Sequence, residues 1–206
     1  HIFSGMPSYS GMLTTGDRWW DFAYKIVFGL ALIFKALFNS DTARVAFWFA
    51  LYGVGIYWLL RSKHKEPAVA FFSAFAAVFS TAVITWIMIG HNTKPIVLAC
   101  LPFTFIFIGK LRAKLSLIYG LLLVLSLYTM LEATHVQMIF YSGLAIGIYL
   151  IFELISRLIS KKDPMGVAKV AGYLAVAGIL AFVMSSDRYY PVMDYTPHST
   201  RGSAPL

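Results

Sequence analysis

Long apolar runs separated by short polar connections constrain this chain more than any other feature of its sequence. A helix needs roughly 20 apolar residues to cross the hydrocarbon core of a bilayer. Backbone groups in lipid must be hydrogen-bonded within the segment, and the alternation expected of barrel strands is absent. The sequence therefore predicts an all-α, polytopic transmembrane bundle. The predicted spans are residues 46–60, 68–90, 95–108, 115–131, 136–159 and 165–184.

Composition supports this class and excludes others. Hydrophobic residues make up 59% of the 206 residues, charged residues only 13%, and the mean hydropathy is +0.74. A soluble domain carries about 25% charged residues. The net charge of +8 does not indicate a nucleic-acid partner, because the Lys and Arg residues lie in the short gaps between apolar runs.

The connections alternate in charge, which predicts the topology. Residues 61–66, 110–114 and 157–163 each contain three Lys or Arg, whereas 91–94 and 132–135 contain only one between them. The positive-inside rule places the basic connections in the cytoplasm. Both ends of this chain are then extracytoplasmic, with residues 1–43 forming an outer loop, 44–184 the transmembrane bundle and 185–206 a second outer segment.

The apolar interval 19–38 is interrupted by Asp21, Lys25 and Lys35 and begins with Trp19 and Trp20. Asp21 and Lys25 are four residues apart and share one helical face. These features favour an amphipathic helix lying on the outer leaflet. The alternative is a seventh span, since the interval is just long enough to cross.

Polar residues of an unusual kind gather on the predicted outer side, where they suit an anionic, polyhydroxylated ligand. The positive-inside rule does not account for Lys94, because it is a basic residue on the predicted outer side. Lys94 is interpreted either as a phosphate contact or as a lysine whose side chain extends to the lipid headgroups. Arg201 can bind a phosphate bidentately, or belong to an unstructured tail. No metal site is predicted, and Cys100 is interpreted as a packed core residue. The candidate substrate-binding residues are His91, Asn92, Lys94, Glu132, His135, Gln137, Tyr195, Ser199, Thr200 and Arg201.

Four short motifs in this order resemble the bacterial YfhO-like membrane proteins. They are residues 3–9 (FSGMPSY), 91–94 (HNTK), 133–137 (ATHVQ) and 195–202 (YTPHSTRG). The resemblance implies a glycosyltransferase of the C superfamily, GT-C, in the bacterial cytoplasmic membrane. Such an enzyme transfers a sugar from a polyprenyl-phosphate donor to a cell-envelope acceptor on the extracytoplasmic face, without a further cofactor.

The resemblance also implies a catalytic acidic residue early in the first outer loop, after a preceding span. The chain starts at His1, and Asp17 and Asp21 both follow the first motif, so neither is assigned as that base. The expectation is an internal fragment that carries much of the substrate site without the catalytic carboxylate. The alternatives are a transporter or flippase of lipid-linked glycans and a non-catalytic membrane assembly subunit.

Overall fold

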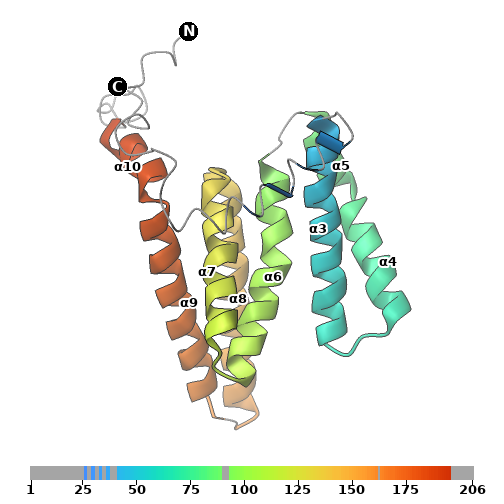
Figure 1. The fold of residues 1–206 in the computed structure, drawn as a ribbon. Helices are drawn as coiled ribbons and strands as arrows, with labels where there is room; N and C mark the ends of the chain where they lie inside the picture. Colours follow the sequence, from blue (N-terminus) through green and yellow to red (C-terminus); the bar gives the residue numbers. More distant parts are fainter. Residues whose placement is uncertain are drawn as a thin grey trace, which may run out of the picture.

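The computed structural model describes residues 26, 29, 30, 33, 36, 37, 41–89, 93–161 and 163–195. Throughout this described part, all regular secondary structure is helical (Figure 1). The helices are α3 (Asp41–Ser62), α4 (Pro67–Val78), α5 (Thr81–Met88), α6 (Lys94–Ala113), α7 (Leu117–Glu132), α8 (Val136–Ile159), α9 (Met165–Met184) and α10 (Ser186–Tyr195).

Within the described residues, five helical segments are long and apolar enough to cross a membrane. They are Val45–Ser62, Pro67–Trp86, Lys94–Ala113, Val136–Ile159 and Met165–Met184, and α7 is a shorter apolar helix of 16 residues. The predicted multi-pass helical bundle is therefore confirmed. One predicted span, 68–90, differs in detail because it is divided into α4 and α5 at Phe79 and Ser80.

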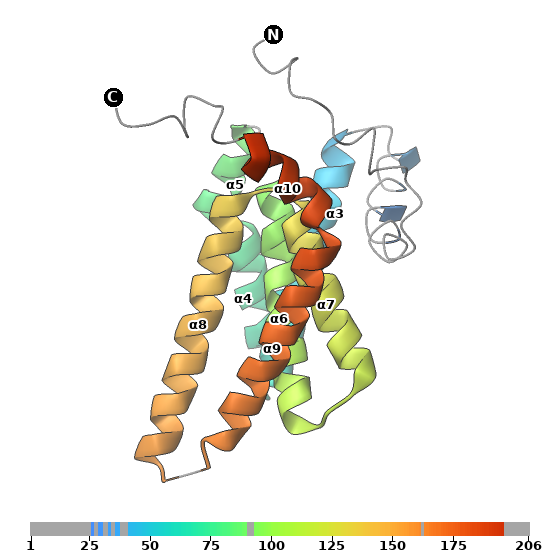
Figure 2. The ribbon, with the colours of Figure 1, turned by 90° about the vertical axis from the view of Figure 1, so that its left-hand side faces the viewer.

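Local sequence accounts for several helix ends. Proline occupies the first turn of α4 and α6, at Pro67 and Pro95, where a missing N–H costs nothing. Three connections contain a residue with positive φ, namely His64 (58°), Thr134 (56°) and Lys161 (51°). A left-handed residue ends a helix and reverses the chain. The long helices α3, α4, α6, α7, α8 and α9 run alternately up and down (Figures 1 and 2).

Helix α6 lies at the centre of the bundle, packed against α3, α7, α8 and α9. Inside the protein, 56% of its span is buried, compared with 11–22% for the other four spans. Thr104 Oγ1 in α6 and Ser126 Oγ in α7 lie 2.8 Å apart, and each lies 3.1 Å from the carbonyl oxygen of Cys100, so that one hydroxyl donates to the other and the second donates to the carbonyl. Cys100 is buried, as expected of a packed residue. Polar contacts of this kind hold helices together where lipid surrounds them.

Helices α3 and α6 approach closely at Gly55. A Cβ atom at this position would lie 2.9 Å from Phe103 Cε2 and 3.0 Å from Pro102 Cβ. Such distances are shorter than ordinary van der Waals contact, so only glycine fits without displacement. The contact positions α3, and through it α4, on one side of the bundle (Figure 1).

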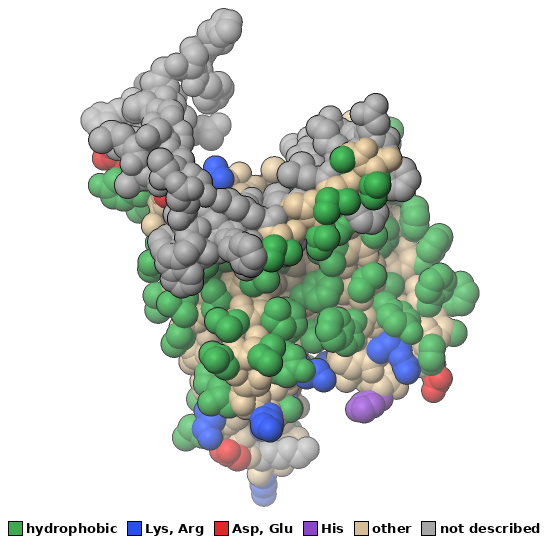
Figure 3. Space-filling view, in the orientation of Figure 1, with side chains coloured by type: hydrophobic (Ala, Val, Ile, Leu, Met, Phe, Trp, Pro, Cys, Tyr) green, Lys and Arg blue, Asp and Glu red, His purple; other side chains and the backbone are tan. Residues whose placement is uncertain are grey.

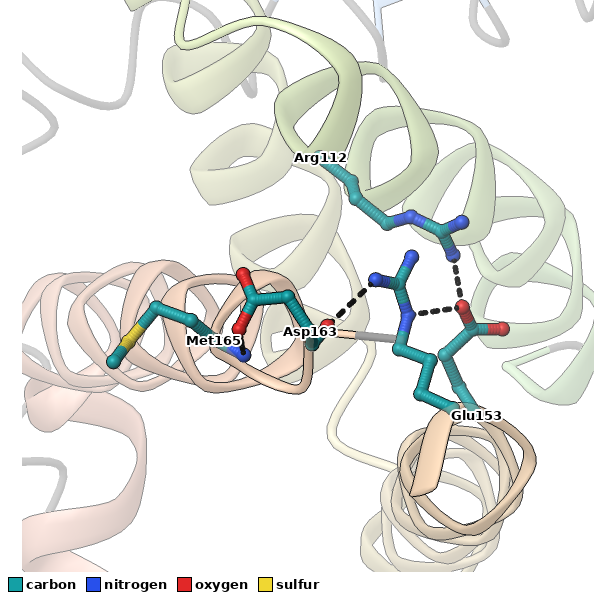
Figure 4. A network of polar contacts seen from close by, with 5 residues as sticks. Arg112, Glu153, Asp163 and Met165 are labelled. Carbon is teal, nitrogen blue, oxygen red and sulfur yellow. Dashed lines mark hydrogen bonds and ion pairs between the residues drawn. The ribbon is translucent and has the colours of Figure 1, made fainter. Parts of the chain in front are cut away.

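The three basic connections lie together at one end of the bundle, here called the basic end (Figure 3). Glu153 Oε1 accepts from Arg157 Nε at 2.9 Å, an ion pair between residues four apart on α8. Arg112 of α6 joins the same oxygen at 2.6 Å (Figure 4). Arg157 also donates to the backbone carbonyl of Asp163 at 3.0 Å, so this network ties α6, α8 and the start of α9 together.

The predicted interfacial helix falls largely outside the described residues. Within 19–38 the described positions are 26, 29, 30, 33, 36 and 37, and each of them is helical. Ile26, Leu30, Ile33 and Leu37 are exposed apolar side chains at spacings of four, three and four residues. This spacing forms one apolar helical face, as an amphipathic helix requires. The choice between an interfacial helix and a seventh span remains a prediction.

Candidate functional site

The end of the bundle opposite the basic end carries four of the polar residues singled out by the sequence, and is here called the polar end. Helix α6 begins there, α7 ends, α8 begins, and α9 passes into α10 (Figures 1 and 2). Helix α10 is the one described helix of markedly polar composition, with the sequence SDRYYPVMDY. It extends the polar end beyond the spans.

Helix α10 is attached to the end of α7 by two side chains. Arg188 Nε donates to Glu132 Oε2 at 3.1 Å, and Tyr189 Oη donates to the carbonyl of Leu131 at 2.7 Å. The Tyr189 ring also stacks on Phe182 of α9, with the ring centroids 6.0 Å apart. The carbonyl of Leu131 belongs to the last turn of α7, where carbonyls have no partner within the helix. These contacts fix α10 against the polar end.

The Glu132–Arg188 pair combines a buried anion with a half-exposed cation. The Glu132 side chain is completely buried, whereas 48% of the Arg188 side chain is exposed. A buried carboxylate needs a compensating charge, because removing it from water costs several kcal/mol. Breaking a buried ion pair by removing one partner destabilises a protein by on the order of 3–5 kcal/mol. The pair therefore positions a guanidinium group at the surface of the polar end, where it can also face an anionic ligand.

Tyr189 is held in its protonated form. Its burial, and then the negative charge of Glu132, raise the pKa of the phenol above its ordinary value of 10.0. Both effects disfavour the phenolate. Tyr189 consequently remains a hydrogen-bond donor to Leu131 at all physiological pH values.

Lys94 begins α6 and is half-buried. Its ammonium nitrogen lies 5.2 Å from the ring centroid of Trp86, at the end of the preceding span. A cation at the N-terminus of a helix is disfavoured by the helix dipole, and a cation–π contact offsets this cost. Lys94 and the positive end of α6 together create a local field that attracts anions.

His135 and Gln137 lie at the start of α8 and have different surroundings. His135 is the N-cap residue, and its Nδ1 accepts from the backbone N–H of Met138 at 3.3 Å. Gln137 is exposed and donates from Nε2 to Tyr141 Oη at 3.2 Å, one turn further along the same helix. His135 therefore has a capping role, and Gln137 lies on the outer surface of α8.

The structure brings four predicted residues to the polar end, namely Lys94, Glu132, His135 and Gln137. Tyr195 is the last residue of α10, and its side chain is not described. The other predicted residues, His91, Asn92, Ser199, Thr200 and Arg201, lie outside the described residues.

The sequence did not single out Arg188 or Tyr189 as site residues. The available signal was Ser186 followed by Asp187, because a serine and an acidic residue are typical of a helix start. That signal predicts a helix but does not identify Glu132 as its partner. Among the described residues, no group of His, Cys, Asp or Glu side chains could hold a metal ion.

Comparisons with protein-family models, with curated proteins and with solved structures found no match to this chain. The functional assignment therefore depends on the residues of the polar end and on the motifs of the sequence.

Proposed function

We propose that this chain is part of a membrane-embedded glycosyltransferase of the bacterial cytoplasmic membrane. Its polar end would face the extracytoplasmic side and bind a polyprenyl-phosphate sugar, from which the sugar passes to a cell-envelope acceptor. The support is the resemblance of four motifs to YfhO-like proteins, together with the position at the polar end of the motif 133–137 and of Thr93 and Lys94, the described part of the motif 91–94.

The attachment of α10 to α7 is the observation that carries the proposal. The contacts of Arg188 and Tyr189 with α7 hold α10 at the polar end. The motif 195–202 begins at the last residue of this helix. Arg201 follows the end of α10 by six residues in the sequence. Lys94 and Arg201 are then the cations proposed to bind the donor phosphate.

In the proposed reaction, this chain would contribute cationic groups held beside the donor phosphate. The acceptor hydroxyl oxygen forms a bond to the anomeric carbon while the bond from that carbon to the phosphate oxygen breaks. The proton of the hydroxyl goes to a general base, for which no residue of this chain is assigned, and polyprenyl phosphate leaves with the electron pair. Cations held in advance beside the phosphate stabilise its developing charge.

The test is binding of a polyprenyl-phosphate sugar to the full chain, measured by native mass spectrometry. Lys94→Ala and Arg201→Ala are compared with Lys161→Ala, which removes one charge at the basic end. A hydrogen bond to a charged group contributes about 1.5–3 kcal/mol, so each polar-end variant should weaken binding roughly tenfold or more. Unchanged affinity in both variants would contradict the proposal and favour a transporter or an assembly subunit.

A further inference from the structure

A second feature of the bundle is a groove that runs along its side between α3 and α4. The cavity has a volume of about 650 Å³ and is lined almost entirely by apolar side chains. Val45, Phe49 and Tyr57 contribute from α3, Phe71 and Phe75 from α4, and Phe79 from the C-cap of α4. These three phenylalanines are 54–58% exposed, so the groove is open along the side of the bundle.

The phenylalanines form an ordered wall. Phe71 and Phe75 are stacked with centroids 6.4 Å apart, and Phe75 and Phe79 are 4.5 Å apart. They repeat every four residues and therefore line one face of α4. Opposite them, the small residues Ala46, Ala50 and Gly53 of α3 leave the space that forms the groove.

The groove lies within two membrane-spanning segments, Val45–Ser62 and Pro67–Trp86. Its surroundings are therefore lipid chains. Along α3 it extends from Val45 to Tyr57, which corresponds to about 18 Å of helix. One leaflet contributes about 15 Å of hydrocarbon, half of the roughly 30 Å core. The groove is thus long enough for the acyl chain of one leaflet.

A basic turn adjoins one end of the groove. Arg61 follows the lining residue Tyr57 by four residues, so both lie on the same face of α3, about 6 Å apart along the axis. Lys63, His64 and Lys65 follow, and all four side chains are exposed. Arg61 donates to the carbonyl of Lys65 at 2.6 Å, which holds the turn together. Blue and purple side chains accordingly lie below the green surface of α3 and α4 (Figure 3).

We propose that the groove and this turn together bind one anionic phospholipid. One acyl chain occupies the groove along Phe71, Phe75 and Phe79, and the phosphate lies against Arg61, Lys63 and Lys65. The apolar groove matches an acyl chain in length, and the cations at its end lie at the depth of the lipid headgroups. Basic pockets at the ends of transmembrane helices bind anionic headgroups in this way. The site is independent of the proposed transferase function.

The test uses the delipidated full chain in detergent, titrated with phosphatidylglycerol or with phosphatidylcholine of the same acyl chains and followed by native mass spectrometry. The headgroup variant is Lys63→Gln/Lys65→Gln. Its matched control is Lys161→Gln/Lys169→Gln, which removes two exposed charges near the start of α9 at the same end. The groove variant is Ala50→Trp, which fills the cavity from an exposed lining position.

Each basic residue near an anionic lipid contributes enough for roughly a fivefold change, so the headgroup variant should lose roughly 30-fold in phosphatidylglycerol affinity. The phosphatidylcholine affinity of the headgroup variant should stay unchanged, and so should the phosphatidylglycerol affinity of the control variant. Ala50→Trp should weaken binding of both lipids while the unfolding midpoint is kept. Equal losses in the headgroup and control variants would overturn the proposal. So would an Ala50→Trp variant that binds both lipids normally but changes its oligomeric mass, since a protein segment would then fill the groove.

Discussion

Arg188 donates to Glu132 across 56 residues of sequence, and this 3.1 Å contact joins the polar helix α10 to the end of the membrane bundle. Glu132 is the buried partner and Arg188 the half-exposed one. The contact therefore provides both an anchor for α10 and a cation at the surface of the polar end. Two of the predictions below follow from it.

Arg188→Ala should release α10 from α7. The change removes an ion-pair partner of a buried carboxylate, and we expect a loss of about 2 kcal/mol, less than the roughly 3–5 kcal/mol of a fully buried pair because Arg188 is half exposed. The measurement is the rate of protease cleavage within 186–195 in detergent. Arg157→Ala, which loses an ion pair at the basic end, serves as the control. Equal cleavage of Arg188→Ala and the unmodified protein would contradict the anchoring role.

Tyr189 gives a pH-dependent prediction for the same helix. Its raised pKa means that the folded protein retains the phenol proton when an unfolded tyrosine, with a pKa near 10.0, has begun to lose it. The contribution of Tyr189 to stability should therefore be complete below pH 10 and fall as the pH rises through the higher folded pKa.

Tyr189→Phe should cost about 1 kcal/mol at neutral pH, because it removes the hydrogen bond to Leu131. The substitution should also remove the part of the alkaline loss of stability that is due to Tyr189. Thermal unfolding followed between pH 8 and pH 11 provides the measurement. A variant with the same alkaline profile as the unmodified protein would show that folding does not raise the pKa of Tyr189.

Gly55→Ala should destabilise the bundle by about 1–3 kcal/mol, because the added methyl group collides with Pro102 and Phe103 of α6. Gly109→Ala is the matched control in α6, where a Cβ atom would meet nothing within 4 Å. It should leave stability unchanged or raise it by up to about 1 kcal/mol through helix propensity. Unfolding in mixed micelles compares the two. Similar effects of both substitutions would contradict the close approach of α3 to α6.

Thr104 and Ser126 should be energetically coupled. Their hydroxyls lie 2.8 Å apart and share the carbonyl of Cys100. A double-mutant cycle with Thr104→Val and Ser126→Ala should give a coupling of about 0.6 kcal/mol, with about 1.7 kcal/mol as the upper bound for such contacts in membranes. Additive effects of the two substitutions would contradict a direct interaction between the two hydroxyls.

The sequence predicted the spans because hydropathy is a local property. The ranges 136–159 and 165–184 coincide with α8 and α9. The break at Phe79 and Ser80 was not predicted, because continuous apolar character cannot distinguish one helix from two. Helix α10 and the pairing of Arg188 with Glu132 were also missed. A short polar helix has a weak periodic signal, and its partner is set by tertiary packing rather than by neighbouring residues.

Labelling of single cysteines in intact bacterial cells tests most directly whether the polar end is the extracytoplasmic substrate-binding end of a membrane protein. Cys100→Ala removes the only native thiol, and Thr93→Cys and Ser160→Cys then report on the polar and basic ends separately. We predict that a membrane-impermeant maleimide labels Thr93→Cys in intact cells and Ser160→Cys only after permeabilisation. Labelling of Ser160→Cys but not Thr93→Cys in intact cells would place the polar end in the cytoplasm and contradict the account.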